Sequence, residues 1–176
     1  MTITSIDFET ANYSHMSICA AGIAVFEDGE LTESPYWLVR PPKGHGWFRD
    51  DFIECHGLTH VDVREAPEFS TIAPEFLPRL TRADIVIAHN AQFDIGHLSD
   101  TLAHFGVAKP QFDYTCTLTL SRRVWPELPS HGLKALTTHK RLTPGLARRM
   151  ANLVIHTRSW RRPVSSWAVT PSGTAT

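Results

Sequence analysis

The sequence predicts an α/β fold: a mixed β-sheet of three antiparallel N-terminal strands plus parallel strands, flanked by helices. Two observations lead to this prediction. Residues near the N-terminus follow the period of β-strands, whereas later segments show helical spacing separated by short apolar runs. The resulting order is three strands, then helix, strand, helix, strand and helix, in which a helix can connect two parallel strands. A length of 176 residues favours a single domain.

An antiparallel meander is predicted to open the chain. Its three strands are expected at Thr2–Phe8, Ser17–Phe26 and Leu31–Val39. Asp28-Gly29 is a typical hairpin turn between the second strand and the third. Pro41 and Pro42 end the third strand, because proline cannot donate to the ladder of a sheet.

The chain from about residue 50 to residue 139 is predicted to consist of helices around two short strands. Apolar residues recur with helical spacing in Pro67–Leu80 and in Ala91–Phe105, with Gly106 as a C-cap. The run Asp84–Ala88 between them is predicted to be a buried strand. Further predicted elements are a short helix around Asp50–Cys55, a strand at Phe112–Thr115, a helix to about Trp125, the start of a helix at Leu133–His139 and a helix within Leu146–Ile155.

Composition excludes several classes of protein. The longest apolar run, Ile18–Phe26, has nine residues, whereas a membrane-spanning helix needs about 20. Asp7 and Glu9 stand where a signal peptide would need an apolar core, so we expect a cytoplasmic protein with no membrane partner. Its three cysteines are odd in number and form no CxxC pair, which predicts reduced thiols in or near the core rather than disulfides or a zinc site.

The charged residues divide the chain into two unlike parts. Residues 1–127 contain all 18 acidic residues and nine of the 17 Lys and Arg residues, and residues 128–176 contain the other eight. Such asymmetry is typical of a tail that binds nucleic acid, or of a segment foreign to the preceding fold. We therefore predict a domain over residues 1–140 and an atypical basic tail over residues 141–176, partly disordered.

The triplet Asp7-Phe8-Glu9 is the first candidate for chemistry. Residues i and i+2 of a strand point to the same face, so Asp7 and Glu9 place two carboxylates side by side at the end of an apolar strand. Two such charges are unfavourable together unless a cation lies between them, and Mg²⁺ and Mn²⁺ prefer oxygen ligands. The alternative is that both carboxylates lie on a solvated strand end.

The segment His89-Asn90-Ala91-Gln92-Phe93-Asp94 is the second candidate. It follows a short apolar strand and opens a helix. Asn90 is a good N-cap, and Asp94 lies in the first helical turn, where the helix dipole favours a negative charge. Helix capping and a functional role therefore explain this segment equally well.

In this order, the two segments resemble the first two motifs of the DEDD exonucleases. Three further stretches resemble the bacterial proofreading-type, DnaQ-like members of that superfamily: His56-Gly57-Leu58-Thr59, Ala66-Pro67-x-Phe69 and Leu128-Pro129-Ser130-His131-x-Leu133-x-x-Leu136. The resemblance covers about residues 2–140.

This resemblance implies an RNase H-like fold and metal-dependent 3′→5′ hydrolysis of phosphodiester bonds. Two ions, Mg²⁺ or Mn²⁺, would be held by Asp7, Glu9 and Asp94, which are the implied catalytic residues. The implied substrate is the 3′ end of single-stranded DNA, and a DNA polymerase is an implied partner. The positions that match nucleotide contacts in relatives, through backbone, stacking or hydrogen bonds, are Phe8, Thr10, Leu58, Asn90 and Phe93.

The sequence departs from the superfamily at the third motif, which supplies a His general base and, five residues later, a fourth carboxylate. These residues should follow His139, but the last Asp is Asp113 and the last acid is Glu127. His131, His139 and His156 are candidate replacement bases, although none has the required spacing to an Asp. Two explanations remain open: the tail has diverged, or the segment after about His139 is an out-of-frame reading.

Three alternatives to a DNA exonuclease follow from these observations. Related families with the same motifs act on RNA. A chain that lacks the fourth carboxylate can instead be a catalytically impaired module that binds nucleic acid, with Arg and Trp of the basic tail as contacts. The remaining alternative is a plain metal-binding protein.

Overall fold

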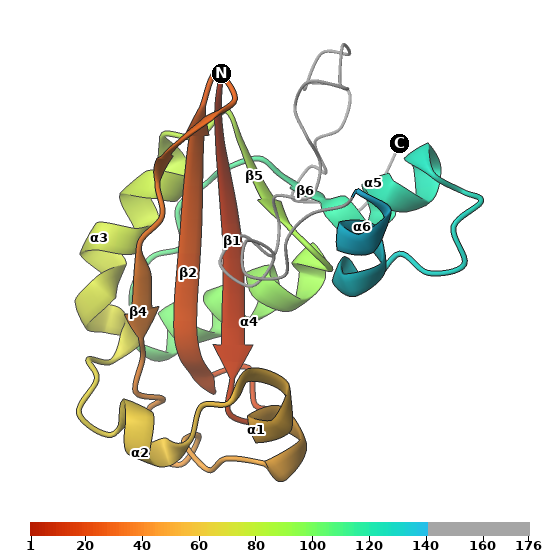
Figure 1. The fold of residues 1–176 in the computed structure, drawn as a ribbon. Coiled ribbons are helices and arrows are strands. Elements are labelled where there is room, and N and C mark those ends of the chain that lie inside the picture. The colour runs from red at the N-terminus through yellow and green to blue at the C-terminus, as the bar shows by residue number, and fades with distance from the viewer. Residues whose placement is uncertain (141–176) are drawn as a thin grey trace.

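The computed structural model describes residues 1–140, and the predicted basic tail and the helix within Leu146–Ile155 lie outside the described residues. The strands are β1 (Thr2–Thr10), β2 (Ile18–Glu27), β3 (Glu30–Glu33), β4 (Tyr36–Leu38), β5 (Ile85–Ala88) and β6 (Tyr114–Cys116). The helices are α1 (Asp50–His56), α2 (His60–Val63), α3 (Phe69–Thr81), α4 (Ala91–His104), α5 (Thr117–Val124) and α6 (Leu133–His139). Figure 1 shows the sheet with α3 and α4 beside it.

The strands form one mixed sheet, as the sequence predicted. Its order is β3-β2-β1-β5-β6, and β4 also pairs with β2. The long β1 runs antiparallel to β2 over its whole length, with a bulge between Glu9 and Thr10. By contrast, β1 pairs with the parallel β5 only over Ile3–Ser5, and β5 pairs in turn with the parallel β6. The second half of β1 is therefore not paired with β5.

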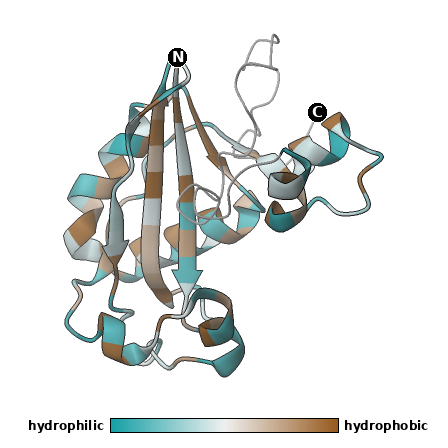
Figure 2. Ribbon diagram, viewed as in Figure 1, coloured by the Kyte–Doolittle hydropathy of each residue, from teal (hydrophilic) through white to brown (hydrophobic). Residues whose placement is uncertain are grey.

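The main core lies between the sheet and the helices α3 and α4. Alternate residues of β1, among them Ile6 and Phe8, enter this core with Phe69, Phe76 and Leu80 of α3 and with Leu98 and Leu102 of α4. Burying each such side chain stabilises the fold by about 1.5–3 kcal/mol. Figure 2 shows that β2 is largely hydrophobic, whereas the C-terminal end of β1 turns hydrophilic. The C-terminal end of β1 thus differs from the hydrophobic strand beside it, which indicates a role other than packing.

The predicted third strand Leu31–Val39 is wrong as a single element. Two short strands, β3 and β4, replace it, and both pair with β2. Pro35 lies between them and has no N–H to donate, although its carbonyl accepts the amide of Ile23 at 3.0 Å. The hairpin turn before β3 is confirmed: Asp28 and Gly29 both have positive φ angles, of 51° and 92°.

A second, smaller core lies at the C-terminal end of β1, where the segment after β4 packs against residues of β2 and of the loop after β1. It contains Ala11, Cys19 and Val63, with Leu58 and Phe48 packed against them. The motif His56-Gly57-Leu58-Thr59 explains the local chain path. Gly57 ends α1 in a left-handed conformation, and Thr59 begins α2 through a capping box with Asp62.

The three cysteines lie in different environments, and the prediction that all of them are in or near the core is wrong for Cys55. All three cysteines are free; Cys19 is buried and Cys116 is partly buried, but Cys55 is exposed on α1. Among residues 1–140, no helix is both long and apolar enough to cross a membrane.

Candidate functional site

Asp7 and Glu9 lie on one face of β1, as the alternation of the strand predicts. Phe8 points to the opposite face, where its ring stacks on Phe76 at 5.6 Å and meets Phe69 edge-on at 6.0 Å between ring centroids. The packing of Phe8 against α3 therefore fixes the direction in which the two carboxylates point.

Small residues of β2 stand directly opposite these carboxylates. Gly22 pairs with Asp7 and Ala20 pairs with Glu9. On the other side of β2, Tyr36 pairs with the same Gly22, so Asp7, Gly22 and Tyr36 form one row across three strands. A Cβ atom on Gly22 would lie 3.7 Å from the Asp7 carbonyl oxygen and 3.8 Å from Cδ2 of Tyr36. The middle of this row thus carries no side chain.

Tyr36 was not singled out by the sequence, although it shares this row. Its side chain is largely exposed. Partial burial raises the pKa of its hydroxyl, and the negative charges of Glu9 and Asp7 raise this pKa further. Tyr36 lies near the carboxylates because of the register of β4 against β2. Strand propensity does not predict the register between two strands, so the sequence did not indicate this residue.

Asp94 approaches β1 from the first turn of α4. Its Oδ1 accepts the backbone N–H of Phe8 at 3.1 Å, and the side chain is buried. The bond is possible because β5 has already stopped pairing with β1 at Ser5. Asp94 therefore takes the place of a strand partner and brings a third carboxylate beside Asp7.

The raised pKa values of Asp7 and Asp94 favour a cation bound beside them. Burial, and then the charge of Glu9, raises the pKa of Asp7 to about 7. Burial, and then the charge of Asp7, raises the pKa of Asp94 well above its ordinary value, although the Phe8 amide opposes this. No described residue forms an ion pair with Asp7 or Asp94. A bound cation would relieve both shifts.

The donor set fits a hard divalent cation, because all three side chains offer carboxylate oxygens. Within residues 1–140, however, no group of three or more His, Cys, Asp or Glu side chains is already arranged around one ion position. One oxygen of Asp94 is committed to the Phe8 amide. Asp7 and Glu9 are thus the pair that can share an ion, with Asp94 beside them.

The five proposed substrate positions fall into two groups. Phe8 and Thr10 have buried side chains, and the Thr10 carbonyl accepts the ring N–H of His56 at 3.1 Å. Leu58 is partly buried in the smaller core. Asn90 and Phe93, in contrast, are exposed at the start of α4.

The capping explanation for the His89–Asp94 segment is not what the structure shows. Asn90 is the N-cap residue of α4, but its side chain makes no capping hydrogen bond, and it has a left-handed φ of 65°. The Asp94 carboxylate accepts the Phe8 amide of β1. His89 is held by Thr117, whose hydroxyl lies 3.0 Å from its Nδ1, and burial lowers the pKa of its imidazole.

The candidate replacement bases have structural contacts elsewhere. Nε2 of His131 lies 2.9 Å from the Trp125 carbonyl, which it reaches across the turn before α6. The ring of His139 packs on Trp125 at 5.5 Å between centroids. His156 lies outside the described residues. The rings of His131 and His139 are thus both placed against Trp125.

The mixed sheet and the carboxylates of Asp7, Glu9 and Asp94 define an α/β domain whose site offers the oxygen ligands that divalent cations prefer. A family model described as exonuclease (RNase_T) matches residues 4–143, so the chain belongs to this exonuclease family, within the DEDD superfamily. The resemblance drawn from the sequence motifs is therefore confirmed.

Two of the relatives are DNA polymerase III proteins. A PolC-type DNA polymerase III of Oceanobacillus iheyensis is 29% identical over 140 residues, which are 78% of this chain and 10% of that protein. The epsilon subunit of DNA polymerase III of Haemophilus influenzae is 32% identical over 132 residues, 69% of this chain and 50% of the subunit. The chain thus spans about a tenth of the first relative and half of the second.

Solved structures support the fold. Exonuclease I with bound product has a TM-score of 0.74 at 14% identity, covering 86% of this chain and 41% of that one. Exonuclease X in complex with 5′ overhanging duplex DNA has a TM-score of 0.64 at 23% identity, covering 80% and 74%. The RNase H-like architecture implied by the sequence motifs is therefore confirmed.

Proposed function

We propose that this chain is a 3′→5′ exonuclease that hydrolyses the phosphodiester bond at the 3′ end of single-stranded DNA. The observation that carries the proposal is the set Asp7, Glu9 and Asp94, in which the partly buried Asp7 and the buried Asp94 have raised pKa values and no described ion pair. Family membership and a structural relative in complex with overhanging duplex DNA support it.

Each residue of the site has a role in this proposal. Asp7, Glu9 and Asp94 would hold Mg²⁺ or Mn²⁺, and the resemblance to the superfamily implies two such ions. Such ions, when bound, acidify a water molecule and stabilise the charge of the leaving oxygen. Asn90 offers an exposed amide to the terminal nucleotide, and the exposed ring of Phe93 offers a surface on which a base can stack.

The absence of the third motif lowers the ion affinity and the cleavage rate that we expect of this site. One carboxylate fewer weakens the attraction for a divalent ion, and Mg²⁺ gives up its waters reluctantly. The His and Asp of the third motif are absent after His139, so general-base assistance, typically a 10²- to 10⁴-fold effect, is expected to be weak. We therefore expect cleavage that is slow and that requires a high concentration of the ion.

Cleavage of end-labelled oligonucleotides tests the proposal. A 5′-labelled single strand incubated with Mg²⁺ or Mn²⁺ should give a ladder that shortens from the 3′ end. Asp7→Ala should abolish the ladder. Asp113→Asn should leave it intact, because Asp113 is an exposed residue directly before β6, which is separated from β1 by β5. A ladder that persists in Asp7→Ala, or an endonucleolytic pattern, would overturn the proposal.

The same assay separates the alternatives. Faster cleavage of an RNA strand of equal sequence would favour the RNA exonuclease. Salt-sensitive binding without cleavage would favour the impaired binding module. A divalent-ion affinity that does not change when nucleotide is added would favour a plain metal-binding protein.

The proposed partner is a DNA polymerase, because the relatives are polymerase III proteins much longer than this chain. Co-elution of the chain with a polymerase III catalytic subunit in size-exclusion chromatography tests this point. Separate elution at micromolar concentrations would contradict it.

A further inference from the structure

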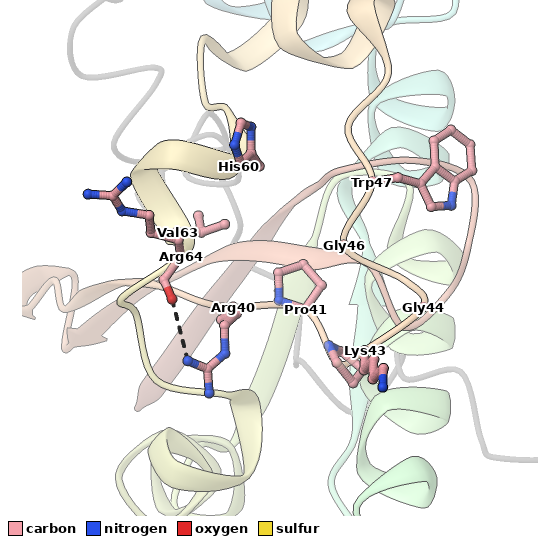
Figure 3. Close-up of a pocket in the computed structure, with 10 residues that line it drawn as sticks. Arg40, Pro41, Lys43, Gly44, Gly46, Trp47, His60, Val63 and Arg64 are labelled. Carbon is pink, nitrogen blue, oxygen red and sulfur yellow. Dashed lines mark hydrogen bonds between the residues drawn. The ribbon is translucent and has the colours of Figure 1, made fainter.

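A pocket of about 340 Å³ lies between the loop that follows β4 and helix α2. Figure 3 shows Arg40, Lys43 and Trp47 from the loop side and His60 and Arg64 from the helix side. A volume of this size is within the range of pockets that hold small ligands, although this one is open to solvent.

The pocket is tied to the strand that carries the carboxylates. The amide group of Asn12 donates to the carbonyls of His45 at 2.9 Å and Trp47 at 2.6 Å, and the Arg49 amide donates to Ala11 at 3.0 Å. Asn12 follows Glu9 by three residues, a span of at most about 11 Å. The loop that lines the pocket is therefore held next to the end of β1 that bears the site.

The lining is cationic. Arg40 lies 3.6 Å from Glu68, and Arg64 lies 3.6 Å from Glu65, with all four side chains solvent-accessible. Exposed pairs of this kind are weak and rearrange easily. Lys43 is exposed and has no ion pair with any residue of the described part of the chain. The pocket therefore has one uncompensated positive charge and two cations that can turn toward an anion.

The loop is restrained at its start by two prolines and carries an exposed aromatic side chain. Pro41 and Pro42 fix its entry, and the amide of His45 closes a turn onto the Pro42 carbonyl at 3.0 Å. Trp47 is 55% exposed at the end of this loop, although large aromatic side chains are usually mostly buried. A preorganised loop loses little entropy on binding, and an exposed indole provides a stacking surface for a base.

From these features we infer that the pocket binds a backbone phosphate of the polynucleotide strand, on the 5′ side of its last three nucleotides. Lys43 is the main phosphate contact, Arg40 and Arg64 supplement it, and Trp47 stacks on a neighbouring base. The inference rests on the proposed function for the direction of the strand, but binding itself requires no cleavage. It also explains how a chain with a weak ion site can retain its substrate.

Equilibrium binding of fluorescein-labelled dT3 and dT12 to the full chain in EDTA tests the inference without any cleavage. Lys43→Gln should weaken binding of dT12 at least threefold and reduce the slope of log K against log salt by about 0.7, the value for one phosphate of a single strand. Trp47→Ala should weaken dT12 binding about fivefold or more. The trinucleotide, held at the 3′ end, should show neither loss.

The matched control is Lys109→Gln, because Lys109 is an exposed lysine on the loop after α4 and does not line the pocket. Equal effects of the two lysine substitutions would overturn the inference, as would equal effects of Lys43→Gln on dT3 and dT12. A wild-type chain that binds dT12 through Lys43 yet never degrades it would refute the proposed function while leaving the pocket assignment intact. Circular dichroism spectra should confirm that each variant is folded.

Discussion

Replacing Asp7 with Asn should stabilise the ion-free protein at neutral pH while abolishing cleavage. The pKa of Asp7 is about 7 in the folded protein, against 3.8 for an ordinary aspartate. Because its folded pKa is raised, the folded state holds the proton more tightly than the unfolded state does. The contribution of Asp7 to the free energy of unfolding is therefore most favourable below pH 4 and falls as pH rises to about 7.

The size of the effect follows from the two pKa values. Each pH unit between them corresponds to about 1.4 kcal/mol, which gives an upper limit of about 4 kcal/mol. The side chain of Asp7 is partly exposed, and solvent screening reduces this limit to about 1–2 kcal/mol. Asparagine has the same shape and no charge, so Asp7→Asn should raise Tm at pH 8 by about 3–8 °C and should change Tm little at pH 4.

Thermal unfolding of the full chain in EDTA, followed by circular dichroism from pH 4 to pH 8, measures this difference. The difference in Tm between Asp7→Asn and wild type is the decisive quantity, because other acids titrate equally in both. Addition of Mg²⁺ at pH 8 should then stabilise the wild type more than the variant. A Tm difference that is the same at pH 4 and pH 8, or a variant less stable at pH 8, would refute the electrostatic reasoning.

Three further predictions concern other parts of the fold. Gly22→Val should fill the middle of the row between Asp7 and Tyr36 and lower kcat/KM more than tenfold with little change in Tm; equal kcat/KM values would contradict it. Glu33→Gln should destabilise the protein above pH 5 and should do so progressively less as the pH falls through the lowered pKa of Glu33, because the Arg82 and Arg79 side chains stabilise only the ionised carboxylate; urea unfolding at several pH values measures this. Thr59→Ala should cost about 1 kcal/mol by removing the capping box of α2, and thermal unfolding that matches wild type would argue against the cap.

The sequence predicted those elements whose burial pattern repeats along the chain. In α3, the buried residues Phe69, Ile72, Ala73, Phe76 and Leu80 keep helical spacing, and the structure confirms this helix. The placement of Asp7 and Glu9 on one face followed from strand geometry alone, since the alternation of side chains depends on no other part of the molecule.

Shorter elements were predicted less well, for physical reasons. Helix α2 has four residues, too few for any periodicity to be visible, although the spacing of Thr59 and Asp62 was a usable capping signal. Pro35 was a sequence signal for the division of the third strand. The apolar character of Tyr36–Leu38 nevertheless led to the prediction of one continuous strand, because strand propensity does not show which backbone N–H groups must donate to the sheet.

The role of Asp94 depends on register, which no local pattern contains. Its position in a first helical turn is sufficient for a dipole explanation, and Asn90 is sufficient for a cap. Yet the side chain of Asn90 makes no cap, and the residue adopts the left-handed conformation, which asparagine tolerates better than most non-glycine residues. A residue that only caps a helix typically has extended backbone angles instead. The hydrogen bond from the Phe8 amide to Asp94 explains the left-handed turn at Asn90. This turn directs the start of α4 toward the half of β1 that is not paired with β5, where Asp94 lies beside Asp7.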